Sequence, residues 1–303
     1  MLTDMEIRGV RDRVLLLRSL ETLGGLDLDD YTMLAEHARN RFFRPGEELI
    51  GEDQTLHSVY IVIDGKVEVS RGGRSTVVVD RGHGVGFLSL LGRVERGFAA
   101  RALVASWVLE IPCEAVLDAF EINFALLRNA LRQTCMLLVR QRENLPASRA
   151  SGSEGTGEIS LGTYRERDRT VVERIIEARK VPIFRNCNVD AVAELMRKNR
   201  EIRGPAGQVF WRIGDPSTFW FRIEYGHVEC ENDAGQTVVV GDRYVLGVAD
   251  ALARQSRSYR ARALTEYIGM RSEVETFLTV LEAHFDLAMD FLAVMARQLI
   301  DED

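Results

Sequence analysis

The sequence contains few of the residues that form disulfides, bind metals or cross membranes. Its 303 residues include four cysteines and five histidines. The cysteines form no C-x-x-C pair and have no histidine cluster near them, so we expect neither a disulfide framework nor a zinc site. No apolar run approaches the roughly 18 residues that a membrane-spanning helix needs, and the N-terminus lacks the pattern of a signal peptide. A cytoplasmic protein with reduced thiols, no metal and no membrane contact is expected.

Positive charge is scarce relative to negative charge. The chain has 39 Lys and Arg against 46 Asp and Glu, which gives a net charge of −7. Proteins that bind DNA neutralise its phosphates with clustered cations. The chain also ends at Asp303, directly after its last helix, which leaves no room for a helix-turn-helix. We therefore expect no DNA partner, and a DNA-binding regulator is the weakest of the functional alternatives.

No arrangement of residues points to catalysis. The five histidines are scattered, and none has the spacing of a nucleophile–base pair or of a metal site. The glycine-rich stretch at residues 82–86, GHGVG, lacks the Gly-Lys-Ser/Thr ending of a phosphate-binding P-loop. We expect a protein that is not an enzyme and that carries no cofactor.

A change of composition divides the chain. Residues 145–162, LPASRASGSEGTGEISLG, are rich in Ser and Gly, contain no aromatic residue and show no helical or strand period. Such a segment buries too little apolar surface to offset its ordering entropy. The sequence therefore predicts a flexible linker at 145–162, between a first domain at residues 1–144 and a second domain at residues 163–303.

The stretches on either side of this linker begin alike. Each starts with a short amphipathic helix followed by a proline and a turn glycine. Asp27 or Asp29 can cap the helix of the first copy, and Asn188 or Asp190 the helix of the second. The same two elements therefore open both halves.

Turn glycines then recur in a common register. Gly46 opens the first copy and Gly207 the second, and a further turn glycine follows nineteen residues later in each, at Gly65 and Gly226. Runs of β-branched and aromatic residues flank these glycines and predict hairpins. Each copy continues with a strand and a glycine-containing loop, and ends in a long apolar helix. One unit of structure is therefore present twice.

The order of these motifs resembles a known family. The pattern Y-I-V-x-x-G-x-V-x-V, a Gly-rich loop and R-x(5)-A before a final strand and helix are similar to the cyclic-nucleotide-binding domain superfamily, over about residues 39–142 and 181–303. The superfamily includes the catabolite activator protein and the regulatory subunits of cAMP-dependent protein kinase. The resemblance implies a mainly β fold with flanking helices (α+β), namely two tandem antiparallel β-rolls of the double-stranded β-helix or jelly-roll-like type, each with a C-terminal helix pair. It also implies cAMP, cGMP or another cyclic nucleotide as a ligand.

In this family a short loop between two strands binds the ligand. The loop opens with Gly-Glu and a helical turn, and a later arginine binds the cyclic phosphate, while the glutamate binds the ribose 2′-hydroxyl. The resemblance places this loop once in each copy, and ten residues separate its glycine from its arginine in both. The corresponding residues are Gly86, Phe87, Leu88, Ser89 and Arg96 in the first copy, and Gly247, Val248, Ala249 and Arg257 in the second.

Both copies lack the glutamate of this loop. Phe87 and Val248 stand in its place, and neither side chain can accept a hydrogen bond. A buried hydroxyl without a partner costs about 1–3 kcal/mol, or about 5- to 150-fold in affinity. We therefore expect weak or atypical binding of cAMP and cGMP. In the alternative interpretation, Arg96 and Arg257 are ordinary surface arginines, and the two apolar residues belong to the core.

The C-terminal helix is apolar over much of its surface. An unbroken heptad runs through residues 274–299, beside a second apolar seam. One side can cover its own roll, and the other needs a helix from the first domain or from a second copy of the chain. Packing within its own domain is the alternative. We expect a protein partner or a homodimer through Leu278, Leu281, Phe285, Leu292 and Met295.

Together these features favour a non-catalytic, cytoplasmic regulatory protein. It would sense a small anionic ligand of the cyclic nucleotide type. The alternative is a pair of degenerate domains that serve purely as a scaffold for protein–protein interaction.

Overall fold

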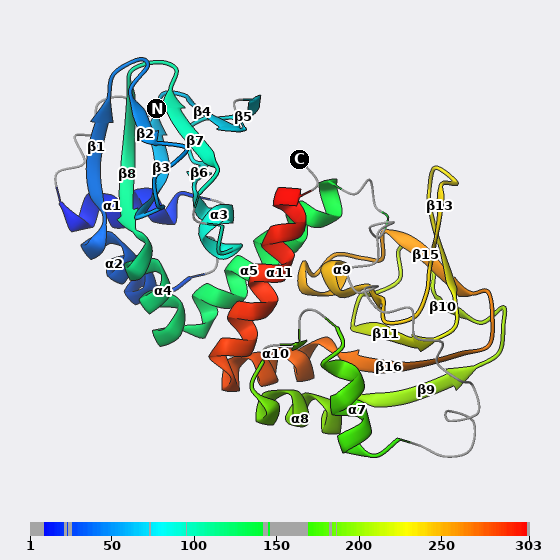
Figure 1. Ribbon diagram of the computed structural model, residues 1–303. Coiled ribbons are helices and arrows are strands. Elements are labelled where there is room, and N and C mark those ends of the chain that lie inside the picture. Colours follow the sequence, from blue (N-terminus) through cyan, green and yellow to red (C-terminus); the bar gives the residue numbers. More distant parts are fainter. Residues whose placement is uncertain are drawn as a thin grey trace. The chain divides into compact units, whose positions relative to one another are not determined.

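The structure is a computed structural model of the chain (Figure 1). It describes residues 9–20, 23, 26–72, 74–94, 96–141, 145, 169–181, 184–185 and 187–301. The chain divides into two compact units, one of Met1–Ala130 with Ala296–Asp303 and one of Leu131–Met295. The linker expected at 145–162 lies outside the described residues, apart from Leu145, so the domain boundaries stay predictions.

The first copy of the repeat runs from α1 to α5 and contains a β-roll, here called the first roll, made of β1 to β8. Its strands pair antiparallel in two four-stranded sheets, in the orders β1-β8-β3-β6 and β2-β7-β4-β5. The helices are α1 (Val10–Arg18), α2 (Leu28–His37), α3 (Phe87–Leu91), α4 (Cys113–Ile122) and α5 (Phe124–Gln141). The strands are β1 (Arg39–Phe43), β2 (Glu48–Ile50), β3 (Ser58–Asp64), β4 (Val67–Arg71), β5 (Arg74–Val79), β6 (Gly84–Val85), β7 (Phe98–Ala102) and β8 (Ser106–Pro112).

The second copy has the same plan, and its β9 to β16 form the second roll. The sheet orders are β14-β11-β16-β9 and β10-β15-β12-β13, again antiparallel. The helices are α7 (Val171–Ala178), α8 (Val189–Lys198), α9 (Val248–Leu252), α10 (Val274–Ala283) and α11 (Phe285–Asp301). The strands are β9 (Arg200–Gly204), β10 (Val209–Trp211), β11 (Phe219–Tyr225), β12 (Val228–Asn232), β13 (Thr237–Val240), β14 (Val245–Leu246), β15 (Tyr259–Ala263) and β16 (Tyr267–Glu273).

Corresponding elements stand at a constant distance in the sequence. β1 and β9, α3 and α9, and α5 and α11 each begin 161 residues apart. The strand orders of the two rolls are also the same after this offset is applied. The structure therefore confirms two tandem antiparallel β-rolls with flanking helices, and any residue of the first copy can be compared directly with its counterpart in the second.

Each roll encloses an apolar core between its two sheets. Side chains alternate along a strand, so every second residue of β3 and β11 faces this core. In the first roll these residues are Tyr60 and Val62, and in the second they are Phe221 and Ile223. The residues between them point to the other face of the sheet.

The hairpin glycines are fixed by both backbone conformation and space. Gly65 and Gly226 have φ of +106° and +100°, which lies in the region that favours glycine. A Cβ atom on Gly65 would lie 2.3 Å from Ser106 Oγ, and one on Gly226 would lie 2.5 Å from the carbonyl oxygen of Glu266. No larger side chain fits at either turn without a shift of the neighbouring strand.

The expected helix caps are confirmed in detail. Asp27 accepts a hydrogen bond from the backbone N–H of Asp30 at the start of α2. Asn188 accepts one from Asp190 at the start of α8. Of the two capping residues that the sequence allowed in each copy, the more N-terminal one serves as the cap.

The apolar heptad at residues 274–299 does not follow one helix. The helix ends at Ala283, His284 has φ of −134°, and a new helix begins at Phe285. Asn123 breaks the first copy at the corresponding position, between α4 and α5. A single heptad is therefore the wrong description, because the break redirects the second helix of each pair. The expected C-terminal helix pair is present in both copies.

Candidate functional site

The candidate loop of the first roll is a tight turn into a short helix. Gly86 has φ of +86° and precedes α3, which contains Phe87, Leu88 and Ser89. A Cβ atom on Gly86 would lie 3.3 Å from a methyl carbon of Leu56. This position therefore needs glycine for both conformation and space.

Phe87 stands where the family has its glutamate, and its ring lies against the loop itself. A Cβ atom on Gly84 would lie 2.6 Å from Cδ2 of this ring. Phe87 and Leu88 are partly exposed, whereas Ser89 is buried. The loop therefore offers an apolar surface where the family offers a carboxylate.

Arg96 is exposed to solvent at the far end of this loop. Its Nε and Nη2 donate hydrogen bonds to Thr55 Oγ1 over 3.3 and 3.1 Å. Among the described residues, no carboxylate forms an ion pair with it. A guanidinium held in this way keeps its charge and its remaining donors available to an anion.

The second roll treats the corresponding arginine in the opposite way. Arg257 is 1% exposed and lies inside the roll. Its Nη1 donates to the carbonyl oxygen of Gly247 over 3.0 Å, and its Nη2 donates to that of Phe219. Its guanidinium carbon lies 4.0 Å from the ring centre of Trp211 and 5.0 Å from that of Phe219. Arg257 is therefore held by the protein's own carbonyls and aromatic faces.

A buried carboxyl group accompanies Arg257. Asp250 lies in α9, is 2% exposed, and accepts a hydrogen bond from Ser258 Oγ over 2.8 Å. Burial raises the pKa of Asp250, and burial likewise lowers the pKa of Arg257. Val248 and Ala249, which precede Asp250, are buried and partly buried. The anion-binding position of this copy thus lies next to a carboxyl group of the same chain.

The interior around the second loop is filled with aromatic rings. Trp211 lies 5.7 Å from the ring of Phe219 and 5.7 Å from that of Tyr259. The first roll has Ile50, Ser58 and Phe98 at the corresponding positions. The second roll therefore holds larger side chains than the first roll around its arginine.

The structure thus treats the two predicted loops differently. It joins Gly247 to Arg257 by a hydrogen bond, whereas it turns Arg96 toward Thr55. The sequence reasoning missed the aromatic clamp of Trp211 and Phe219. Its signal was the replacement of the first copy's smaller residues by aromatic ones 161 residues later.

Other kinds of site are not found in the part of the chain that the structure describes. No group of three His, Cys, Asp or Glu residues there could hold a metal ion. The four cysteines are free thiols, and burial raises the pKa of Cys230. No described helix is both long enough and apolar enough to cross a membrane.

Comparison with known proteins identifies a family for the first roll. Residues 40–123 match the family described as cyclic nucleotide-binding domain. No curated protein matches this chain.

The chain is also similar to several solved structures at low sequence identity. The regulatory domain of Toxoplasma gondii PKA with cAMP is 15% identical, with 98% of this chain and 100% of that chain covered and a TM-score of 0.36. The regulatory subunit of a cAMP-independent protein kinase A from Trypanosoma brucei is 13% identical, with 98% and 91% covered and a TM-score of 0.35. The sensor domain of the transcriptional regulator DNR from Pseudomonas aeruginosa is 16% identical, with 46% and 96% covered and a TM-score of 0.40. With TM-scores below 0.5, these similarities carry no argument about a ligand or a partner.

Proposed function

Because residues 40–123 belong to the cyclic nucleotide-binding domain family, we propose that this chain is a non-catalytic, cytoplasmic regulatory protein that senses a small anionic ligand of the cyclic nucleotide type. The first roll is the sensing element. The second roll has the same fold, but its interior is occupied by its own side chains.

The contrast between the two arginines carries this proposal. Arg96 is exposed and bonded only to a hydroxyl among the described residues, so a phosphate can compete for it. Arg257 already donates to two backbone carbonyls and is stacked on two rings. A ligand phosphate would have to break these contacts and pull a buried cation out of the roll. The first loop therefore binds an anion at lower cost than the second.

Binding in the first roll is expected to be weak. Phe87 offers no acceptor to a ribose hydroxyl, and its ring lies against Gly84. The missing hydrogen bond costs about 1–3 kcal/mol. A ligand that carries the cyclic phosphate but relies on apolar contact beside it suits this loop better than one that depends on its ribose.

The helix pair after β8 is the element that would respond. The buried face of α4 is formed by Ala115, Val116, Ala119 and Phe120, while Ile122 at its end is 76% exposed. A ligand in the loop before β7 would change how this pair packs on the roll. The apolar face offered to a partner would change with it.

The scaffold alternative has its own support in the first roll. Phe42 on β1 and Trp107 on β8 are 46% and 48% exposed, and their ring centres lie 5.1 Å apart. An exposed aromatic pair of this kind is typical of protein interfaces. In this alternative, the roll binds a protein through these side chains and no nucleotide is required.

Thermal unfolding with cAMP, cGMP and a cyclic dinucleotide tests the proposal. A ligand that binds the folded state raises its stability by mass action, by about 2.7 kcal/mol at a hundredfold excess over Kd. We expect a shift in the melting temperature with at least one of these ligands, with a Kd in the micromolar range or weaker. Arg96→Ala should abolish the shift, and the matched surface variant Arg101→Ala should keep it.

Two results would contradict the proposal. The absence of any shift at millimolar ligand would favour the scaffold. Nanomolar binding would show that another residue replaces the missing glutamate, and would refute the expected weakness.

A further inference from the structure

The two rolls differ most on the outer face of one sheet. In the first roll, the face of β3 and β8 that points away from the core is apolar, and Val59, Ile61, Leu109 and Ile111 are all at most 4% exposed. In the second roll, the residues at the corresponding positions are Trp220, Arg222, Met270 and Ser272, and all are at most 1% exposed. Burial is equally complete, but polar groups have replaced apolar ones.

The strand register places these polar side chains in adjacent rows. Trp220 of β11 is opposite Ser272 of β16, and Arg222 is opposite Met270. Met270 is in turn opposite Glu201 of β9. Asn199 stands two residues before Glu201, so it continues the row of Trp220 and Ser272.

Helices of the second unit close over this face. The ring of Trp220 lies 5.4 Å from that of Phe277 in α10, and Phe277 lies 5.0 Å from Phe291 in α11. Figure 1 shows α8 and α10 gathered beside β9 and β16. The polar rows therefore lie between a sheet and its covering helices.

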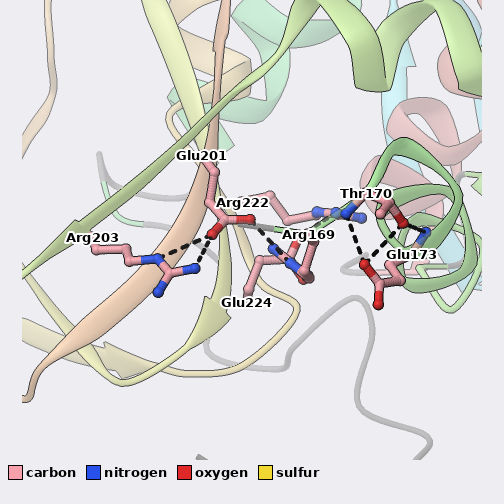
Figure 2. A network of polar contacts seen from close by, with 7 residues as sticks. All are labelled: Arg169, Thr170, Glu173, Glu201, Arg203, Arg222 and Glu224. Atoms are coloured by element: carbon pink, nitrogen blue, oxygen red, sulfur yellow. Dashed lines mark hydrogen bonds and ion pairs between the residues drawn. The ribbon is translucent and has the colours of Figure 1, made fainter. Parts of the chain in front are cut away.

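A network of ion pairs occupies one end of the face (Figure 2). Arg169 donates from Nε to Glu201 over 3.1 Å and from Nη1 to Glu224 over 3.2 Å. Arg203 contacts Glu201 over 2.6 Å, and Arg222 forms an ion pair with Glu224. These five side chains comprise three guanidiniums and two carboxylates, so the network carries one more positive than negative charge.

Several donors beside the network have no hydrogen-bond partner among the described residues. They are Trp220 Nε1, Ser272 Oγ, Arg222 Nη1 and the side-chain amide of Asn199. Each of these residues is at most 3% exposed. A buried polar group without a partner costs about 1–3 kcal/mol, and the first roll avoids that cost with apolar residues.

We propose that a small anion of single charge binds in the second unit between the outer face of β11, β16 and β9 and the covering helices. Trp220 Nε1, Asn199 Nδ2, Ser272 Oγ and Arg222 Nη1 would donate to it. The surplus positive charge of the network favours an anion. A water molecule accepts at most two hydrogen bonds and carries no charge, so it satisfies this set of donors less well.

Chloride is the probe for this site. We compare melting temperatures of the full chain in sodium chloride and in sodium gluconate at equal ionic strength, because gluconate is too large for a closed site. We expect a saturable rise of about 3 °C in chloride. Asn199→Ala places there the residue that the first roll has at position 38, and it should lose at least half of the rise. Asn40→Ala, the same change in the first roll, should keep it.

Bromide gives a readout that does not depend on a variant that folds. Crystals of the wild-type chain grown in sodium bromide should show an anomalous peak within hydrogen-bond distance of Trp220 Nε1 or Arg222 Nη1. Equal melting temperatures in chloride and gluconate, together with no bromide peak, would overturn the proposal and assign the donors to internal water. An unchanged chloride response in Asn199→Ala would overturn it as well. Neither result bears on the nucleotide loop of the first roll, so the two proposals fail separately.

Discussion

At the scale of single residues, the same arginine has two different environments in the two copies. Arg96 lies on the surface beside Thr55, whereas Arg257 lies between Trp211 and Phe219. Burial of a guanidinium is costly unless its donors are satisfied, and here backbone carbonyls and aromatic faces do so. The nature of the neighbouring side chains, not the position in the repeat, decides whether the arginine can meet a ligand.

The first prediction concerns these two arginines. Arg257→Ala removes two hydrogen bonds and the contacts with two rings, so it should lower the free energy of unfolding of the second unit by about 3 kcal/mol. Arg96→Ala removes an exposed side chain and should change stability by no more than about 0.5 kcal/mol. Urea unfolding followed by tryptophan fluorescence, which reports directly on Trp211, measures both. Equal effects of the two substitutions would contradict the buried role of Arg257.

At the scale of elements, the break in each C-terminal helix pair redirects an apolar surface. His284 accompanies the break, and its Nε2 lies 2.9 Å from a carboxylate oxygen of Glu194 in α8. Leu281 before the break and Leu292 after it are both fully buried within the single chain. The homodimer through this seam stays a prediction, and the burial shows that a second copy is not needed to cover these two leucines.

The second prediction follows from this burial. Leu281→Glu places a carboxylate in a closed apolar site, which should cost more than about 4 kcal/mol and unfold the second unit. Ile122→Glu, the same kind of change at an exposed helix position, should leave the fold intact. Circular dichroism and light scattering together separate the outcomes. A Leu281→Glu chain that stays folded while its mass falls by half would instead place the seam at a dimer interface.

At the scale of the whole molecule, one repeat has diverged into two rolls with different interiors. The offset of 161 residues holds from the first helix to the last. Within this common frame, the second roll has exchanged small residues for aromatic ones around its loop, and apolar residues for polar ones on its outer sheet face. The exchange separates a roll that can sense a ligand from a roll whose interior is filled.

The third prediction concerns the connection between the two copies. The Ser- and Gly-rich composition of residues 145–162 favours a flexible chain, which a protease cleaves more readily than folded structure. Limited proteolysis should therefore cut there first and release two folded fragments of similar size, identified by mass spectrometry. Early cleavage elsewhere, with this segment protected, would show that it is docked on a folded part of the chain.

The sequence by itself determined the repeat, the hairpins and the places of the two loops. These features rest on local requirements, such as the positive φ at Gly65 and the cap at Asp27, and a local requirement is visible in one residue and its neighbours. The missing glutamate at Phe87 was visible in the same way. The tertiary structure alone decided which arginine is exposed and where the apolar helix breaks. Trp211, Phe219 and Arg257 come from different strands and loops, and only the closure of the roll brings their side chains together.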